Sequence, residues 1–180
     1  LTILGFALAL RIASTIMFPS AHYPDETFQA LEQAHRYVFG YGIKPWEFEI
    51  GLRSTVLPVV LAVIFKASDA LGLPIVLAAR IALAALSLLP VLAIYRAGQR
   101  VSPLHAVIGG IAAATWCELV NFSFRPLTEA LATNFILTAL ALVPGIGVGV
   151  VREIRGVETG EGADLPVFLE VGGREPALGD

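Results

Sequence analysis

Residues 73–95 read LPIVLAARIALAALSLLPVLAIY, and Arg80 is the only charged residue in this stretch. A helix of about 20 mostly apolar residues can cross the hydrocarbon core of a bilayer, which is about 30 Å thick. The stretch therefore predicts a membrane-spanning helix. The alternative is a buried helix of a large soluble protein, but apolar stretches this long and this poor in charge are more typical of membrane spans.

The composition of the whole chain supports a membrane protein. Of its 180 residues, 56% are hydrophobic and 15% are charged, and the mean hydropathy is +0.76. Soluble domains average about 45–50% apolar and about 25% charged residues, so an ordinary soluble enzyme domain is excluded. The net charge of −3 offers no basic face for nucleic acid. The single cysteine, Cys117, excludes an internal disulfide and a zinc site made of paired cysteines.

Four further apolar stretches predict spans, which gives an all-α, polytopic membrane protein. The five predicted spans are residues 1–18, 52–71, 73–95, 103–120 and 127–151. Residues 1–18 could also be a signal peptide, but no clear small-residue cleavage site precedes Pro19 and more spans follow, so we interpret them as an anchor. The segment 152–180 is rich in glycine and acidic residues and is predicted to be a polar, disordered or truncated tail.

The polar segment 19–51 lies between the first two predicted spans and contains an amphipathic pattern. Pro24 can occupy the first position of a helix, and Asp25 and Glu26 then fall in the first turn, where the helix dipole favours carboxylates. Apolar residues recur at helical spacing up to Phe39, which predicts a helix on the membrane surface. The aromatic residues that follow are typical of anchors at the membrane interface.

Spacing alone leaves two interpretations of Asp25 and Glu26 open. They could only start a surface helix, or one of them could act in catalysis. Adjacent helix positions project about 100° apart, so both carboxylates cannot face one substrate atom. His22 could be an ordinary interfacial histidine, and Trp46 with Glu47 could be a surface anchor beside a solvated acid.

The residues of this segment, taken together, resemble the first external loop of glycosyltransferase family 22. The matching residues are His22, Pro24-Asp25-Glu26, Phe28-Gln29, Glu32, Gly42, Trp46-Glu47-Phe48, Arg53-Ser54 and Pro58. A later stretch, Arg125-Pro126-Leu127-Thr128-Glu129, resembles a degenerate form of a second family motif. The chain departs from the family pattern in two places: Tyr23 separates the histidine from the proline, and Lys44-Pro45 stands where threonine often precedes the tryptophan.

The resemblance implies a GT-C-type helix bundle and a mannosyltransferase of the kind that acts in N-glycan and glycosylphosphatidylinositol assembly, in this case a bacterial relative. Members of this family move a sugar, with inversion, from a polyprenyl-phosphate donor to a glycan or glycolipid acceptor. The implied location is a membrane, either the plasma membrane of a bacterium or the endoplasmic reticulum of a eukaryote. Because family members are several hundred residues long, we expect this chain to be an N-terminal portion.

The resemblance also assigns roles to residues. Asp25 is the implied general base and Glu26 a supporting residue, because an acceptor hydroxyl must lose its proton as it attacks the sugar. The implied substrate-binding residues are His22, Gln29, Trp46, Glu47, Arg53, Arg125 and Glu129. Arginine suits the donor phosphate through its bidentate geometry, and Arg36 is a further candidate for this role. No metal ligand or cofactor is assigned, and a divalent cation stays open.

Several residues in this scheme have ordinary structural interpretations as well. Arg53 could reach the lipid headgroups from a helix start, and Arg125 could pair with Glu129. Charges inside spans are costly and usually face protein, so we expect Arg11 to face the helix bundle or to reach the headgroups.

The order of the five spans conflicts with the charge distribution. If segment 19–51 is external, simple alternation places Arg96 and Arg100 outside, whereas basic residues favour the cytoplasmic side. One span is therefore expected to be misassigned, and the short stretch 52–71, which runs into Lys66, is the first candidate.

Two other functions compete with a transferase. A transporter could line a pathway with its intramembrane charges (Arg11, Arg80, Glu118 and Glu129), and a truncated, non-catalytic remnant of a transferase is the third possibility. Transporters place their polar residues in broken helices at mid-membrane. Here the densest acidic and aromatic cluster lies in an interfacial loop, which favours an enzyme that acts on lipid-linked substrates.

Overall fold

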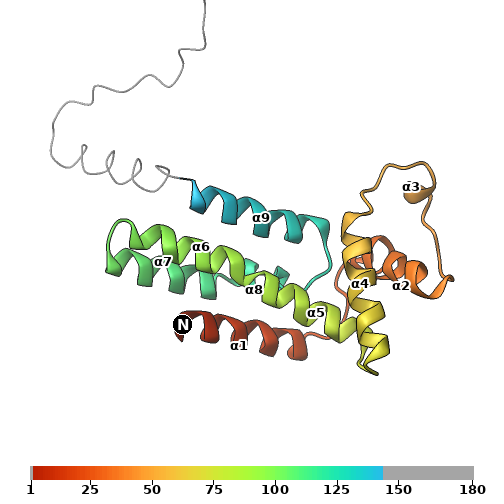
Figure 1. The fold of residues 1–180 in the computed structure, drawn as a ribbon, viewed down its shortest axis with the longest axis horizontal. Helices are drawn as coiled ribbons and strands as arrows, with labels where there is room; N and C mark the ends of the chain where they lie inside the picture. Colours follow the sequence, from red (N-terminus) through yellow and green to blue (C-terminus); the bar gives the residue numbers. More distant parts are fainter. Residues whose placement is uncertain (1, 144–180) are drawn as a thin grey trace, which may run out of the picture.

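The computed structural model describes residues 2–143, and within this range all regular structure is helical (Figure 1). The elements in chain order are α1 (Thr2–Met17), the π-helical turn η1 (Glu26–Leu31), α2 (Glu32–Phe39), α3 (Trp46–Glu49), α4 (Val56–Ala70), α5 (Ile75–Leu86), α6 (Leu88–Gln99), α7 (Pro103–Thr115), α8 (Cys117–Phe122) and α9 (Thr128–Leu142). The predicted all-α class is therefore confirmed for the described residues. The predicted tail 152–180 and the end of the predicted span 127–151 lie outside them.

The longer helices form a bundle. Figure 1 shows α1, the α5–α6 pair, α7 and α9 running alongside one another, and α6 contacts both α7 and α9. Helices α5 and α6 form a nearly continuous apolar rod, Ile75–Gln99, and this is the one helix of the described chain that is long and apolar enough to cross a membrane. Helices α1, α7 and α9 are apolar but shorter. Helix α1, the α5–α6 pair, α7 and α9 overlap the predicted spans 1–18, 73–95, 103–120 and 127–151, respectively.

Helix α4 differs from the prediction of a span over residues 52–71. It has 15 residues, as many as α9, but it carries two charged residues, Lys66 and Asp69, towards its C-terminal end. In Figure 1 it crosses one end of the bundle together with α2 and α3. Its buried residues Leu57, Leu61 and Phe65 belong to the same core as Ala30 and Ala34 of the preceding loop. One face of α4 therefore packs against that loop, whereas Val56, Val59, Val60 and Val63 are exposed.

The segment after α1 forms a helix, as predicted; its predicted position on a membrane surface stays a prediction. Residues 24–39 are helical and separate from α1, and Gly40 ends the helix in the left-handed conformation with φ of 82°. The first turns are π-helical, with the N–H of Glu32 donating to the carbonyl of Thr27 five residues earlier. Such π-helical turns are rare and occur frequently at functional sites.

A buried arginine connects α1 to the α5–α6 junction and to the end of α7. Arg11 of α1 is fully buried, and its Nε donates to Ser87 Oγ at 2.8 Å, between α5 and α6. Its Nη1 and Nη2 donate to the carbonyls of Ala114 and Ala113 at 3.2 and 3.4 Å. These carbonyls belong to the last turn of α7, where helix carbonyls lack partners within the helix. The expectation that Arg11 faces the bundle is confirmed.

Candidate active site

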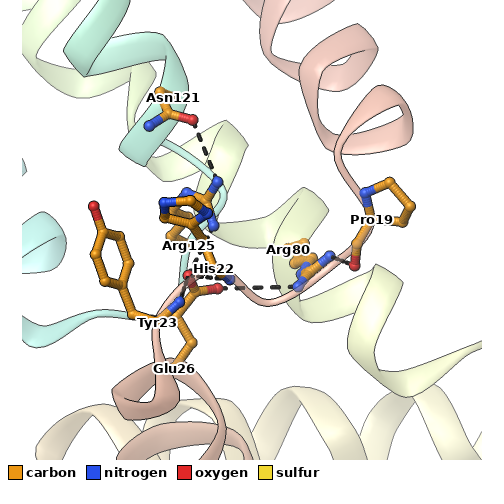
Figure 2. Close-up of polar contacts among 7 residues, drawn as sticks. All are labelled: Pro19, His22, Tyr23, Glu26, Arg80, Asn121 and Arg125. Carbon is orange, nitrogen blue, oxygen red and sulfur yellow. Dashed lines mark hydrogen bonds and ion pairs between the residues drawn. The ribbon is translucent and has the colours of Figure 1, made fainter.

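Glu26 lies at the centre of a buried group of charged side chains at the end of the bundle (Figure 2). Its side chain is fully buried. Its Oε1 accepts a bond from Arg125 Nη1 at 2.7 Å and from the backbone N–H groups of His22 and Tyr23 at 3.1 and 3.2 Å. Its Oε2 lies 4.0 Å from Nη2 of Arg80. Charge-assisted bonds of this kind are stronger than neutral ones, so they fix the turn that precedes η1.

The two arginines reach Glu26 from distant parts of the chain. Arg80 comes from α5 and also donates to the carbonyl of Pro19, at the exit of α1. Arg125 comes from the turn between α8 and α9, and its Nη2 donates to Asn121 Oδ1 at 3.4 Å. Buried charges are costly unless they are paired and hydrogen-bonded. The cluster therefore ties the start of the loop to both α5 and the α8–α9 turn.

The charge within this cluster is not balanced. One carboxylate faces two guanidinium groups, which leaves an excess of one positive charge among the three side chains. Among the described residues, Oε2 of Glu26 and Nε of both Arg80 and Arg125 lack a hydrogen-bond partner. The guanidinium of Arg125 also lies over the rings of Tyr23 and Phe124, at 6.0 and 5.3 Å from their centroids, a position in which aromatic faces stabilise cations.

Asp25, the neighbour of Glu26, faces a cavity. The cavity has a volume of about 470 Å³ and lies between the loop and helices α8 and α9. Two further carboxylates, those of Glu118 and Glu129, line it together with the side chains of Ser123 and Asn134. A carboxylate on such a wall can accept a proton from a bound hydroxyl group.

A chain of polar contacts connects Asp25 to the second half of the loop. Gln29 Nε2 donates to Asp25 Oδ1 at 3.0 Å and to Glu47 Oε2 at 3.2 Å. Arg53 Nε pairs with the same oxygen of Glu47 at 3.2 Å, and its side chain keeps 39% of its surface exposed. The structure thus brings Asp25, Gln29, Glu47 and Arg53 into one connected group, as their places in the family motif suggest.

Other residues named from the sequence lie differently. Trp46 is exposed, and His22 contributes its backbone N–H to Glu26 while its ring contacts Tyr23. Arg125 pairs with Glu26 and not with Glu129. Arg36 donates to Gln33 Oε1. Across residues 2–143, no group of three His, Cys, Asp or Glu side chains is arranged to hold a metal ion.

Sequence reasoning missed site roles for Arg80 and Asn134. Each is a polar residue within a long apolar helix, and such residues usually face the interior of a bundle or a cavity. That signal was present in the sequence. Which neighbour each side chain meets depends on the rotation of its helix in the bundle, which composition does not show.

Comparison with known proteins gives a consistent match. Residues 2–156 match the sequence model of the Alg9-like mannosyltransferase family. GPI mannosyltransferase 3 of Yarrowia lipolytica is 36% identical over 149 residues, which are 78% of this chain and 28% of that protein. Mannosyltransferase APTG1 of Arabidopsis thaliana is 30% identical over 145 residues, 77% of this chain and 25% of that protein.

A shorter match involves an animal protein. GPI alpha-1,2-mannosyltransferase 3 of Mus musculus is 42% identical over 67 residues, 37% of this chain and 12% of that protein. The chain spans about a quarter of the length of the first two relatives. No solved structure matches the chain.

Proposed function

Because this chain belongs to the Alg9-like mannosyltransferase family, we propose that it carries the catalytic loop of a membrane mannosyltransferase. The donor in this proposal is a polyprenyl-phosphate-linked mannose, and the acceptor is a glycan or glycolipid. The relatives named as GPI mannosyltransferases support a glycosylphosphatidylinositol precursor as the acceptor. The observation that carries the proposal is the position of Asp25, on the wall of a cavity and beside the anchored Glu26.

The proposed reaction is a single inverting displacement. A hydroxyl oxygen of the acceptor attacks the anomeric carbon of the donor sugar and loses its proton to Asp25. The bond between that carbon and the phosphate oxygen breaks, and the phosphate leaves with the electron pair. Because the leaving group is already a phosphate, the step requires no general acid and the proposal assigns no cofactor.

Among the described residues, Gln29 alone donates a hydrogen bond to the Asp25 side chain. An ionised carboxylate has about four acceptor sites. Asp25 therefore keeps the capacity to accept the hydrogen bond and then the proton of a substrate hydroxyl. We assign Glu26 to holding the loop, since its carboxylate is already bound to Arg125 and two backbone N–H groups.

Arg53 is the proposed ligand of the donor phosphate. Its Nε binds Glu47, and its side chain remains 39% exposed, so the outer N–H groups of the guanidinium can meet phosphate oxygens. A planar guanidinium binds phosphate in a bidentate manner. Arg125 is only 6% exposed, so we assign it to positioning Glu26.

The proposed location is the membrane of the endoplasmic reticulum, with several spans, because the relatives named above come from eukaryotes. With α4 outside the set of spans, the catalytic loop and the α6–α7 turn lie at opposite ends of the bundle (Figure 1). Placing Arg96 and Arg100 of that turn in the cytoplasm then agrees with the preference of basic residues for the cytoplasmic side. The loop and α4 would lie on the lumenal side.

Cysteine labelling in sealed microsomes tests this topology. In a Cys117→Ser background, Gln99→Cys should react with an impermeant maleimide in intact vesicles, because it lies at the cytoplasmic end. Lys44→Cys, which is exposed in the loop, should react only after detergent opens the vesicles. Reaction of Lys44→Cys in intact vesicles would overturn this orientation.

Two of the four charges named for a transporter pathway, Arg11 and Arg80, have other roles in the structure. Arg11 is fully buried and bonded to Ser87 and to helix carbonyls, and Arg80 is bonded to Pro19 and faces Glu26. Both arginines therefore hold structural elements together and do not line an open pathway.

Transfer assays on membranes that contain the protein test the proposed chemistry. With dolichyl-phosphate mannose as donor, Asp25→Asn should reduce transfer by about 10²–10⁴-fold, the usual contribution of general base catalysis. Binding of the donor should persist, because Arg53 and not Asp25 contacts the phosphate. The matched control is Asp69→Asn, an exposed acid at the end of α4, which should transfer at the wild-type rate. Wild-type transfer by Asp25→Asn would remove this residue from catalysis.

A further inference from the structure

The cavity beside Asp25 has a wall that disfavours anions. Asp25, Glu118 and Glu129 place three carboxylates along it. The nearest excess of positive charge, the pair Arg80 and Arg125, is buried behind the loop and directed at Glu26. Like charges repel over short distances, so these acids disfavour a phosphate group in this cavity. An occupant with many hydroxyl donors would be favoured by the same carboxylates.

Asn134 adds a neutral polar side chain to the lining of the cavity. It lies on α9 after Thr133, which also lines the cavity, and the following residues Phe135 and Ile136 are exposed. Asn134 itself is 8% exposed and lines the cavity. Within residues 2–143, its side-chain amide has no hydrogen-bond partner, although the neighbouring Thr138 hydroxyl binds its backbone carbonyl. In the described part of the chain, the enclosed polar atoms without a partner belong to Glu26, Arg80 and Arg125 and not to Asn134. The Asn134 amide is therefore open to the cavity and can donate hydrogen bonds to an occupant and accept them from it.

The cavity also has an apolar side. The rings of Tyr23 and Phe122 both line it and lie nearly parallel, with centroids 6.2 Å apart and an interplanar angle of 16°. Pyranose sugars combine C–H faces with a rim of hydroxyl groups, so they match a cavity with one aromatic side and one carboxylate and amide side. The volume of about 470 Å³ lies within the usual range of ligand pockets, about 300–1,000 Å³.

From these observations we propose that this cavity is the acceptor subsite and that Asn134 and Glu129 orient the sugar whose hydroxyl reacts at Asp25. The inference rests on the proposed function. It assigns donor and acceptor to different sides of Asp25: the donor phosphate binds on the side of Arg53, and the neutral acceptor sugar binds between the loop and α9. Asn134 and Glu129 are then residues that determine acceptor specificity.

Two-substrate kinetics on the full-length protein, solubilised in detergent, test this assignment. The donor is dolichyl-phosphate mannose and the acceptor probe is octyl α-mannoside. Asn134→Leu keeps a similar volume and removes the amide, so the KM for octyl α-mannoside should rise about tenfold, as expected for the loss of a hydrogen bond. Glu129→Gln should raise it about ten- to a hundredfold, because bonds to charged groups are stronger. The KM for the donor should stay unchanged in both variants.

The matched control is Thr138→Val, one turn along α9, where the lost hydroxyl binds only the backbone carbonyl of Asn134. Its KM values for both substrates should equal those of the wild type. If Asn134→Leu fails to fold, Glu129→Gln still decides the matter, because Glu129 is exposed and supports no other side chain among the described residues. An unchanged acceptor KM in the variants, or a rise in the donor KM alone, would overturn the acceptor assignment.

A binding measurement separates this inference from the proposed function. Saturation-transfer NMR detects octyl α-mannoside on the purified protein without any transfer, and the signal should be lost in Asn134→Leu and kept in Thr138→Val. A wild-type protein that transfers mannose but shows no dependence on Asn134 and Glu129 refutes the acceptor subsite alone. A wild-type protein without transfer, whose sugar binding still depends on Asn134, refutes the proposed function and leaves the sugar site in place.

Discussion

Asp25 and Glu26 are adjacent carboxylates with the same ionic charge, and the fold gives them opposite surroundings. Glu26 is fully buried, with Arg125 at 2.7 Å and Arg80 at 4.0 Å. Asp25 lies on the cavity wall and accepts one hydrogen bond, from Gln29. Neighbouring helix positions project about 100° apart, so the two side chains leave the helix in different directions. One carboxylate can therefore hold the loop while the other stays free to react.

The comparison shows why two carboxylates of the same sequence motif can have different chemical roles. A carboxylate that already accepts three hydrogen bonds has little remaining capacity for a substrate, whereas a carboxylate with one donor keeps most of its capacity. The surroundings of each residue thus decide its role. The same comparison indicates that changes at Glu26 act mainly on stability and changes at Asp25 mainly on turnover.

The largest effect is expected from removing the carboxylate of Glu26. Glu26→Ala leaves two buried guanidinium groups without their carboxylate, and breaking a buried ion pair costs about 3–5 kcal/mol of folding free energy. Thermal denaturation of the purified protein in detergent should show a clear fall in its midpoint. Glu49→Ala, an exposed acid of the same loop, is the control and should change the stability by less than about 0.5 kcal/mol. Equal midpoints for wild type and Glu26→Ala would contradict a buried ion pair.

A smaller effect separates the two carboxylates directly. Glu26→Gln keeps the size of the side chain and removes its charge, so it should lower the stability by about 1.5–3 kcal/mol, the contribution of a charged hydrogen bond. Asp25→Asn should leave the denaturation midpoint unchanged, because its side chain is exposed. Turnover should follow the reverse order, with a larger loss in Asp25→Asn. A stable, inactive Glu26→Gln beside an active Asp25→Asn would assign the base to Glu26.

The bundle could be predicted from the sequence because long apolar runs are a local signal. The runs over residues 1–18, 73–95 and 103–120, and the described part of the run over 127–151, each overlap an apolar helix or helix pair. The run over 52–71 has a similar composition, but its buried residues Leu57, Leu61 and Phe65 belong to the same core as Ala30 and Ala34 of the loop. Apolar residues that face another helix and apolar residues that face lipid look alike in sequence. The position of α4 across the end of the bundle distinguishes it (Figure 1), and its length does not, because α9 also has 15 residues.

The candidate site was harder to predict from the sequence than the helix bundle. The resemblance pointed to Asp25, Gln29, Glu47 and Arg53, and these residues do form one connected group. The partner of Glu26 is 99 positions away in the sequence, and pairing over such a separation depends on how the helices are placed. Nothing in local periodicity distinguishes a buried Glu26 from an exposed Asp25, since both begin the same helix.

The smallest expected effect concerns Gln29, the residue that connects Asp25 to the rest of the loop. Its Nε2 donates to Asp25 Oδ1 at 3.0 Å and to Glu47 Oε2 at 3.2 Å, so it lies between two carboxylates that would otherwise repel each other. Gln29→Leu removes both hydrogen bonds, and the loss of about 1–1.5 kcal/mol of positioning should lower kcat about tenfold with little change in the denaturation midpoint. Tyr37→Phe, an exposed change on the following helix, should leave kcat unaltered. A wild-type kcat in Gln29→Leu would show that Asp25 is positioned by the anchored backbone of Glu26 alone, which would strengthen the contrast between the two carboxylates.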